Sequence, residues 1–159
     1  EELAHRFLDA GREEEAIAHQ AELVVLQPTH GLHLRRLDDL CASSGRHDVL
    51  ADALARAAAG LKDDEGDAEL RVDLLVRAGT VRADVLGDHA GAIGHFAEVL
   101  ATPGASEAIA LPVARRLAGL LLDAGRNDER LGVLERLATL EGDRDARRAV
   151  LGEAARLAE

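Results

Sequence analysis

The chain has 159 residues and a formal net charge of −11, with one cysteine, two phenylalanines and no Met, Trp or Tyr. Alanine and leucine, which favour helices, dominate the composition, and the scarcity of β-branched residues argues against a β-sandwich or barrel. The single cysteine excludes an internal disulfide framework, and the acidic balance disfavours nucleic acid and anionic membranes as partners.

Targeting and membrane signals are not apparent in the sequence. The longest uncharged run, residues 23–34, is too short for a membrane span and contains Pro28 and Gly31. The start of the chain has no apolar signal-peptide region, so we expect a cytoplasmic protein. Because the first residue is Glu1 rather than Met, we also expect the chain to be a segment of a longer protein.

Apolar residues recur with helical spacing along the whole chain, which predicts an all-α protein. Loop-forming residues at 28–31, 62–66, 102–104 and 141–143 separate groups of helices. The predicted helices, in chain order, span residues 2–10, 13–27, 31–43, 47–61, 67–86, 90–101, 106–123, 127–140 and 144–158.

Four glycines mark predicted turns within helix pairs. Gly11, Gly45, Gly87 and Gly125 are 34, 42 and 38 residues apart, and each lies between two predicted helices. Glycine at such a place adopts the left-handed backbone that ends many helices. We therefore predict that Gly11 and Gly125 have positive φ or make a close helix contact.

A longer repeat overlies these turns, because residues 16–23 match residues 92–99 at an offset of 76. Stacked helix pairs of this kind share a continuous core with their neighbours. The predicted repeats of this single domain cover about 1–30, 31–65, 66–104 and 105–142, with a partial repeat at 143–159. The last helix is expected to pack on the fourth repeat through Ala146, Val150, Ala154 and Leu157.

Several positions carry a resemblance to a known family. The matching residues are Gly11, Ala16 and Pro28, then Gly87, Ala92, Phe96 and Pro103, and in first helices Ala4, Phe7, Ala118 and Leu121. Over nearly its whole length the chain resembles the tetratricopeptide-repeat family, with Leu50 and Arg130 replacing a small residue of the family pattern. The resemblance implies a right-handed α–α superhelix, a TPR-like solenoid of about four helix pairs plus a C-terminal helix. The composition is similar to that of bacterial repeat proteins.

Residues that could carry chemistry have simpler structural explanations. Cys41 lies where a first helix packs, so we expect a small buried side chain rather than a nucleophile. His30 and His33, like His89 and His95, lack the partners of a zinc site. The sequence has no phosphate-binding loop of the Gly-Lys-Ser/Thr kind. We expect no catalytic residue, no metal and no cofactor.

Charged residues recur on the first helices, which line the concave groove in the family that the chain resembles. Aligned on the turn glycines, Arg35, Arg77 and Arg115 occupy equivalent positions. The candidate groove residues are His5, Asp9, Arg35, Asp39, Arg77, Asp84, Arg115 and Asp123. Ordinary i, i+4 pairing also explains Arg35 with Asp39, and the aspartates would neutralise the arginines, so this alternative stays open.

These observations lead to the hypothesis of a non-enzymatic scaffold that binds a protein or peptide segment in its groove. An acidic or phosphorylated segment would suit three arginines, and another domain of the parent chain is an alternative occupant. The alternative hypothesis is a regulatory or sensor arm of a larger multidomain enzyme or signalling protein. Weak self-association through the last helix is expected, and neither nucleic acid nor membrane is an expected partner.

Overall fold

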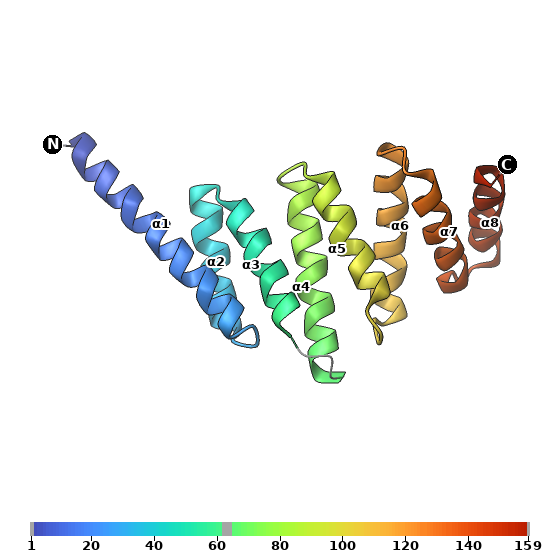
Figure 1. Ribbon diagram of the computed structural model, residues 1–159, viewed down its shortest axis with the longest axis horizontal. Helices are drawn as coiled ribbons and strands as arrows, with labels where there is room; N and C mark the ends of the chain where they lie inside the picture. Colours follow the sequence, from blue (N-terminus) through green and yellow to red (C-terminus); the bar gives the residue numbers. More distant parts are fainter. Residues whose placement is uncertain (1, 62–64, 159) are drawn as a thin grey trace.

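The computed structural model describes the backbone of residues 2–61 and 65–158, and the side chains of residues 11–61 and 67–158. Within these ranges the chain forms eight α-helices and no β-strand (Figure 1), which confirms the all-α prediction. The helices are α1 (Glu2–Leu26), α2 (Gly31–Ser44), α3 (His47–Gly60), α4 (Glu65–Asp84), α5 (His89–Ala101), α6 (Glu107–Asp123), α7 (Asn127–Leu140) and α8 (Arg144–Leu157).

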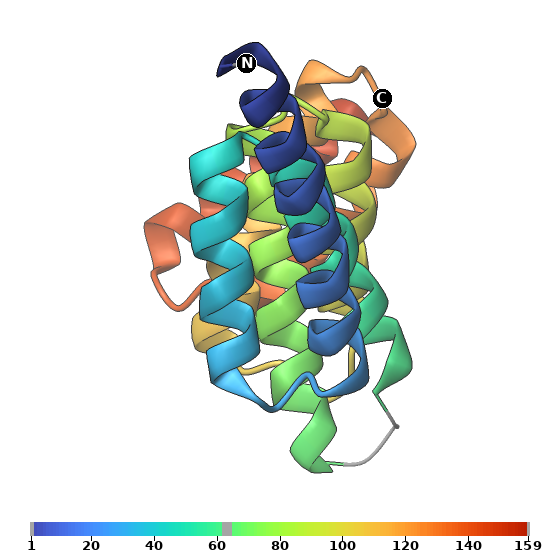
Figure 2. The same cartoon turned by 90° about the vertical axis from the view of Figure 1, so that its left-hand side faces the viewer.

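The helices form a single row rather than a bundle around one centre (Figure 1). Each helix contacts the next one along the chain, and α1 also contacts α3. The turns that join α2 to α3, α4 to α5 and α6 to α7 lie on one edge of the row, and the links from α1 to α2, α5 to α6 and α7 to α8 lie on the opposite edge (Figure 1). Viewed along the row, the helices stack one behind another (Figure 2).

Gly125 ends α6 in the predicted way. Its φ is 67°, the Arg126 N–H donates to the Leu121 carbonyl at 2.9 Å, and the Gly125 N–H donates to the Leu122 carbonyl at 3.0 Å. These two bonds form a Schellman motif, which places a left-handed residue at Gly125. Gly45 and Gly87 also have positive φ, at 73° and 64°, so three of the four predicted turn glycines are confirmed.

The predicted turn at Gly11 is wrong, because α1 runs without a break from Glu2 to Leu26 in place of the expected helices 2–10 and 13–27. Gly11 does not have positive φ, and a Cβ built there meets nothing within 4 Å, so it makes no close helix contact either. Glycine inside a helix costs only about 1 kcal/mol. N-capping does not explain the difference, because α3 and α7 begin after Arg46 and Arg126, neither of which makes a side-chain capping hydrogen bond, and an arginine also follows Gly11.

The row therefore contains three helix pairs, α2–α3, α4–α5 and α6–α7, with α1 before them and α8 after them. All other predicted helix ends agree with the structure within two residues. No helix in the described part of the chain has both the length and the apolar character that crossing a membrane requires.

The buried apolar residues fall into two clusters, and the partly buried Leu100 and Val133 pack against both of them. The larger one extends from α1 to α6 and includes Leu54, Leu74 and Phe96, which are at most 1% exposed. The Phe96 ring packs directly on Gly79 of α4, where an added Cβ would lie 2.7 Å from the ring. Glycine at position 79 thus allows α4 and α5 to approach each other around the only buried aromatic ring among the described side chains.

The smaller cluster joins α6, α7 and α8. Its fully buried members are Ala114, Ala118, Leu134, Leu137 and Ala154. Val150 and Leu157 of α8 pack against it, while Ala146 is half-buried, so the expected inner face of the last helix is confirmed for three of its four residues. The opposite side of α8 leaves Leu151 half exposed.

Candidate functional site

The predicted groove residues lie on α2, α4 and α6, the first helices of the three pairs. Each of these helices buries one side in the core and leaves another side in solvent. We call the solvent side of these helices the first-helix face. Its exposed or half-exposed charged residues include Arg35, Asp39, Glu69, Asp73, Arg77, Asp84, Arg115, Arg116 and Asp123.

Arg77 on α4 reaches back to α2. Its Nη2 donates to Oδ1 and Oδ2 of Asp38, at 3.0 and 2.8 Å. The two side chains are 35% and 34% exposed, so the ion pair bridges the two helices at the surface rather than in the core. The Arg77 guanidinium is thus engaged within the molecule, and its partner is an aspartate that the sequence analysis did not single out.

The same relationship recurs one helix pair later, but through a different arginine. Arg116 of α6 donates to Asp84 of α4. Its guanidinium also lies 5.3 Å from the centroid of the Phe96 ring, within the range of a cation–π contact. Arg116, rather than the predicted Arg115, is therefore the counterpart of Arg77.

Arg115 points toward the other end of the row. It donates to Glu141, at the end of α7, whose side chain is buried. The hydrogen bond from Arg115 holds the pKa of the Glu141 carboxyl below its ordinary value, and the Asp143 N–H is a weaker second donor. Arg77 and Arg115 are equivalent in the glycine alignment, yet they bind opposite neighbours along the row.

The structure does not bring Arg35, Arg77 and Arg115 together as three free guanidinium groups. Arg35, Asp39 and Asp123 are exposed and have no ion-pair partner among the described side chains. The side chains of His5 and Asp9 lie outside the described residues. Two adjacent arginines occur at each of two aligned positions, Arg35–Arg36 and Arg115–Arg116. This doubling already indicated that the alignment could be shifted by one residue.

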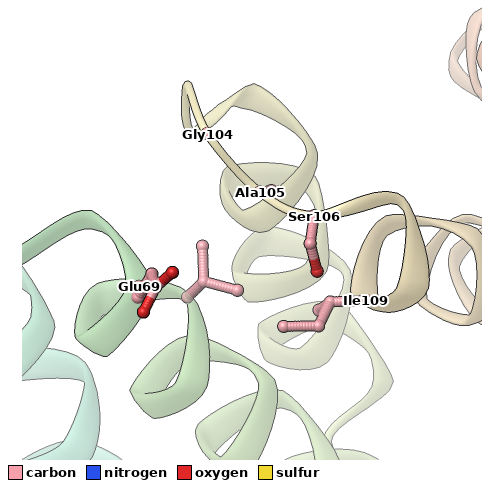
Figure 3. A pocket seen from close by; sticks show the side chains of 6 residues that line it. Glu69, Gly104, Ala105, Ser106 and Ile109 are labelled. Atoms are coloured by element: carbon pink, nitrogen blue, oxygen red, sulfur yellow. The ribbon is translucent and has the colours of Figure 1, made fainter. Parts of the chain in front are cut away.

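Sequence reasoning missed a pocket at the N-terminal ends of α4 and α6 (Figure 3). We call it the α4–α6 pocket; it has a volume of about 330 Å³ and is lined by Glu69, Val72, Gly104, Ala105, Ser106 and Ile109. Gly104, with φ of 87°, turns the α5–α6 link so that the next two residues form one wall. Val72, Ala105 and Ile109 make most of the lining apolar.

Several polar side chains at the pocket have no partner within the described part of the chain. The Ser106 hydroxyl points into the space beside Ile109 (Figure 3), and although Ser106 precedes α6 its side chain makes no capping hydrogen bond. The Glu69 carboxylate is exposed and unpaired among the described side chains. Asp73, one turn further along α4, and Glu107, the first residue of α6, are likewise exposed without an ion-pair partner.

A second polar cluster lies where α3, α4 and α5 meet. Arg82 donates to Asp52 of α3 and to Asp88, each at 2.5 Å, and Asp88, the N-cap of α5, also accepts from the Gly91 N–H in the first turn of that helix. Arg82 Nε and His95 Nε2 are buried without a hydrogen-bond partner. Burial, and secondarily the charge of Arg82, lower the pKa of His95. These groups tie α3, α4 and α5 together, and none of them lines the α4–α6 pocket.

Leu50 and Arg130, which replace the small residue of the family pattern, are both buried, and Arg130 is the charged one of the two. Its Nε donates to the Ala118 carbonyl of α6 at 3.2 Å, and its guanidinium also binds Glu153 of α8. One side chain thus connects the three last helices, which explains how an arginine replaces a small residue at this position.

Cys41, His30 and His33, which were considered above as a nucleophile and as metal ligands, pack within the fold or contact neighbouring side chains. Cys41 is fully buried, and burial raises the pKa of its thiol, as expected for a packed side chain. The ring centroids of His30 and His33 lie 4.3 Å apart. The side-chain amide of the buried Gln20 donates to the His33 carbonyl oxygen at 2.9 Å and lies 3.2 Å from His33 Nδ1. The described residues hold no group of three His, Cys, Asp or Glu side chains arranged to bind a metal ion.

Comparison with known proteins adds no family assignment. No family model matches the chain, and no curated protein sequence matches it significantly.

Proposed function

We propose that the chain is a tetratricopeptide-like solenoid that acts as a non-enzymatic scaffold and binds a segment of a protein partner across its first-helix face. The observation that carries the proposal is the α4–α6 pocket, which lies between two successive first helices and presents both apolar walls and unpaired polar groups. Apolar pockets with a few polar groups are the usual form of ligand sites.

The single-row architecture supports this function. Because each helix contacts mainly its chain neighbours, the row exposes a long surface relative to its core, as repeat proteins that bind extended segments do. The ion pairs from Arg77 to Asp38 and from Arg116 to Asp84 link successive first helices. They hold this surface in a defined shape before a partner arrives, which lowers the entropy lost on binding.

The test is a selection of random displayed peptides on the purified chain, followed by affinity measurements with two matched variants. The first variant carries Arg35→Glu and Asp73→Lys on the first-helix face, where both side chains are exposed and unpaired. The control carries Arg136→Glu and Glu135→Lys on the exposed side of α7. Both double substitutions leave the net charge unchanged.

We expect selected peptides to bind the first variant about tenfold more weakly than the wild-type chain, and the control equally well. Loss of binding in the control alone would place the binding surface on the second helices. Failure of the selection to enrich any peptide over an unrelated helical protein would argue against a peptide-binding scaffold.

A further inference from the structure

We propose that the α4–α6 pocket is a specificity pocket, which receives an aliphatic side chain from a partner segment with a lysine or arginine beside it. This inference rests on the proposed function and adds the chemistry of the partner. It replaces the expectation of an acidic segment, which depended on free arginines.

The shape and lining of the pocket suit an aliphatic side chain. Its volume of about 330 Å³ is at the lower end of the range of about 300–1,000 Å³ for ligand pockets, so it suits a side chain better than a large cofactor. Val72, 1% exposed, belongs to the main core cluster, and Ala105 packs against that cluster, so two apolar positions of the lining are fixed by the fold. Ile109 is 36% exposed and offers apolar surface that an incoming side chain would cover.

The charge around the pocket selects a cation. Glu69 lies in the lining itself, and Asp73 and Glu107 follow on α4 and α6; none has an ion-pair partner among the described side chains. A lysine or arginine next to the inserted aliphatic residue would pair with Glu69 at the rim. The net charge of −11 attracts such a segment over longer distances.

An acidic partner finds less support on the same surface. Arg77 is bound to Asp38, Arg116 to Asp84, and Arg115 to the buried Glu141. Each of these guanidinium groups already balances a carboxylate of the chain, so they offer an anion little uncompensated positive charge. Arg35 and Arg36 of α2 are exposed without an ion-pair partner among the described side chains, but neither lines the α4–α6 pocket, and the exposed Asp39 lies one turn from Arg35.

The experiment uses the peptides selected on the wild-type chain and two pocket variants. Ser106→Leu places a larger side chain in the space, and it removes no capping hydrogen bond because the Ser106 hydroxyl makes none. Glu69→Gln removes the charge and keeps the size of the side chain. The matched controls are Ala97→Leu on the exposed side of α5 and Glu135→Gln on α7. Thermal unfolding of each variant verifies that it is folded.

We expect the selected peptides to share an aliphatic residue next to a lysine or arginine. Their affinity should fall about tenfold in Ser106→Leu and severalfold in Glu69→Gln, with both controls within about twofold of the wild type. Replacing the aliphatic residue of the peptide by serine, or its cation by glutamate, should cause similar losses. Added salt should weaken only the binding of the cationic peptides.

Failure of this inference differs from failure of the proposed function. Peptides that lose affinity in the variant with Arg35→Glu and Asp73→Lys but bind Ser106→Leu normally would overturn the pocket and leave the scaffold in place. Selected peptides without a conserved cation, or with unchanged affinity for Glu69→Gln, would overturn the charge preference. Peptides insensitive to every first-helix variant would overturn both proposals.

Discussion

Asp38 on α2 and Arg77 on α4 are 39 residues apart in the sequence and are joined by two hydrogen bonds. Asp84 on α4 and Arg116 on α6 repeat the relationship one helix pair later. In both cases the arginine reaches back to the preceding first helix. These pairs therefore connect helices that are not neighbours in the chain, and they contribute to the spacing of the row.

The Asp38–Arg77 pair should make a small, measurable contribution to stability. In a double-mutant cycle with Asp38→Ala and Arg77→Ala we expect a coupling energy of about 0.5 kcal/mol, because both partners are a third exposed and screened by solvent. The coupling should decrease as salt is added. A parallel cycle pairing Arg77→Ala with Asp123→Ala should give no coupling. Equal values in the two cycles would contradict the assignment.

Gly11 and Gly125 should respond in opposite directions to the same substitution. Gly125→Ala forces a side chain onto a backbone with φ of 67°, and we expect it to cost more than about 1 kcal/mol of unfolding free energy. Gly11→Ala adds a Cβ with free space around it inside a helix, and it should stabilise the chain by up to about 1 kcal/mol. Chemical denaturation measures both. Destabilisation by Gly11→Ala would contradict the continuous helix α1 and support the turn predicted at Gly11.

Gly79→Ala should destabilise the chain although alanine is the better helix former. The added Cβ would lie 2.7 Å from the buried Phe96 ring, and such overpacking costs about 1–3 kcal/mol. Combining Gly79→Ala with Phe96→Leu, which takes the ring away, should cost less than the sum of the two single changes. Strict additivity in the thermal or chemical unfolding data would show that Gly79 and Phe96 do not compete for space.

Stability should decrease as the pH falls from about 7 to 5 because of His95. Burial lowers the pKa of His95 in the folded chain, so the unfolded chain, with a histidine pKa near 6.5, takes up the proton first. The free energy of unfolding therefore falls below about pH 6.5 and continues to fall until the folded pKa is reached. Burial shifts the pKa of His33 in the same direction, so part of the slope belongs to that residue.

His95→Gln should make this pH dependence shallower, as measured by urea unfolding at a series of pH values. Ala97→Gln, on the exposed side of α5, introduces the same side chain without removing a titratable group; it is the control and should leave the slope unchanged. The interval avoids the acid range in which carboxyls such as Glu141, with its lowered pKa, become protonated. An unaltered slope in His95→Gln would contradict the buried, unprotonated state of this histidine.

The helix bounds could be predicted closely because glycine, proline and helix-starting residues mark most of the helix ends. The exception is Gly11. Gly11 has the same Ala-Gly-Arg setting as Gly125, and Arg126 makes no side-chain capping hydrogen bond at the start of α7, so no local cap residue separates the two. A glycine is tolerated inside a helix at a cost of about 1 kcal/mol, so this setting alone does not decide where a helix ends. The candidate site was less predictable. A shift of one residue between Arg115 and Arg116 turns the side chain toward a different helix, and sequence spacing does not resolve that shift. The α4–α6 pocket combines residues from two helices and a link, which no local pattern reveals.

The division of the apolar residues into two clusters has a consequence for motion. Three of the five fully buried members of the smaller cluster are alanines, and Ala154 is the single fully buried residue of α8, so little apolar area holds that end. Local unfolding should therefore begin at α8, whose amide hydrogens should exchange with solvent faster than those of α4. Val72 belongs to the larger cluster. The α4–α6 pocket, which Val72 lines, should therefore stay formed while α8 unfolds and refolds locally. Ligand binding at the pocket and local unfolding of α8 should then be independent of each other.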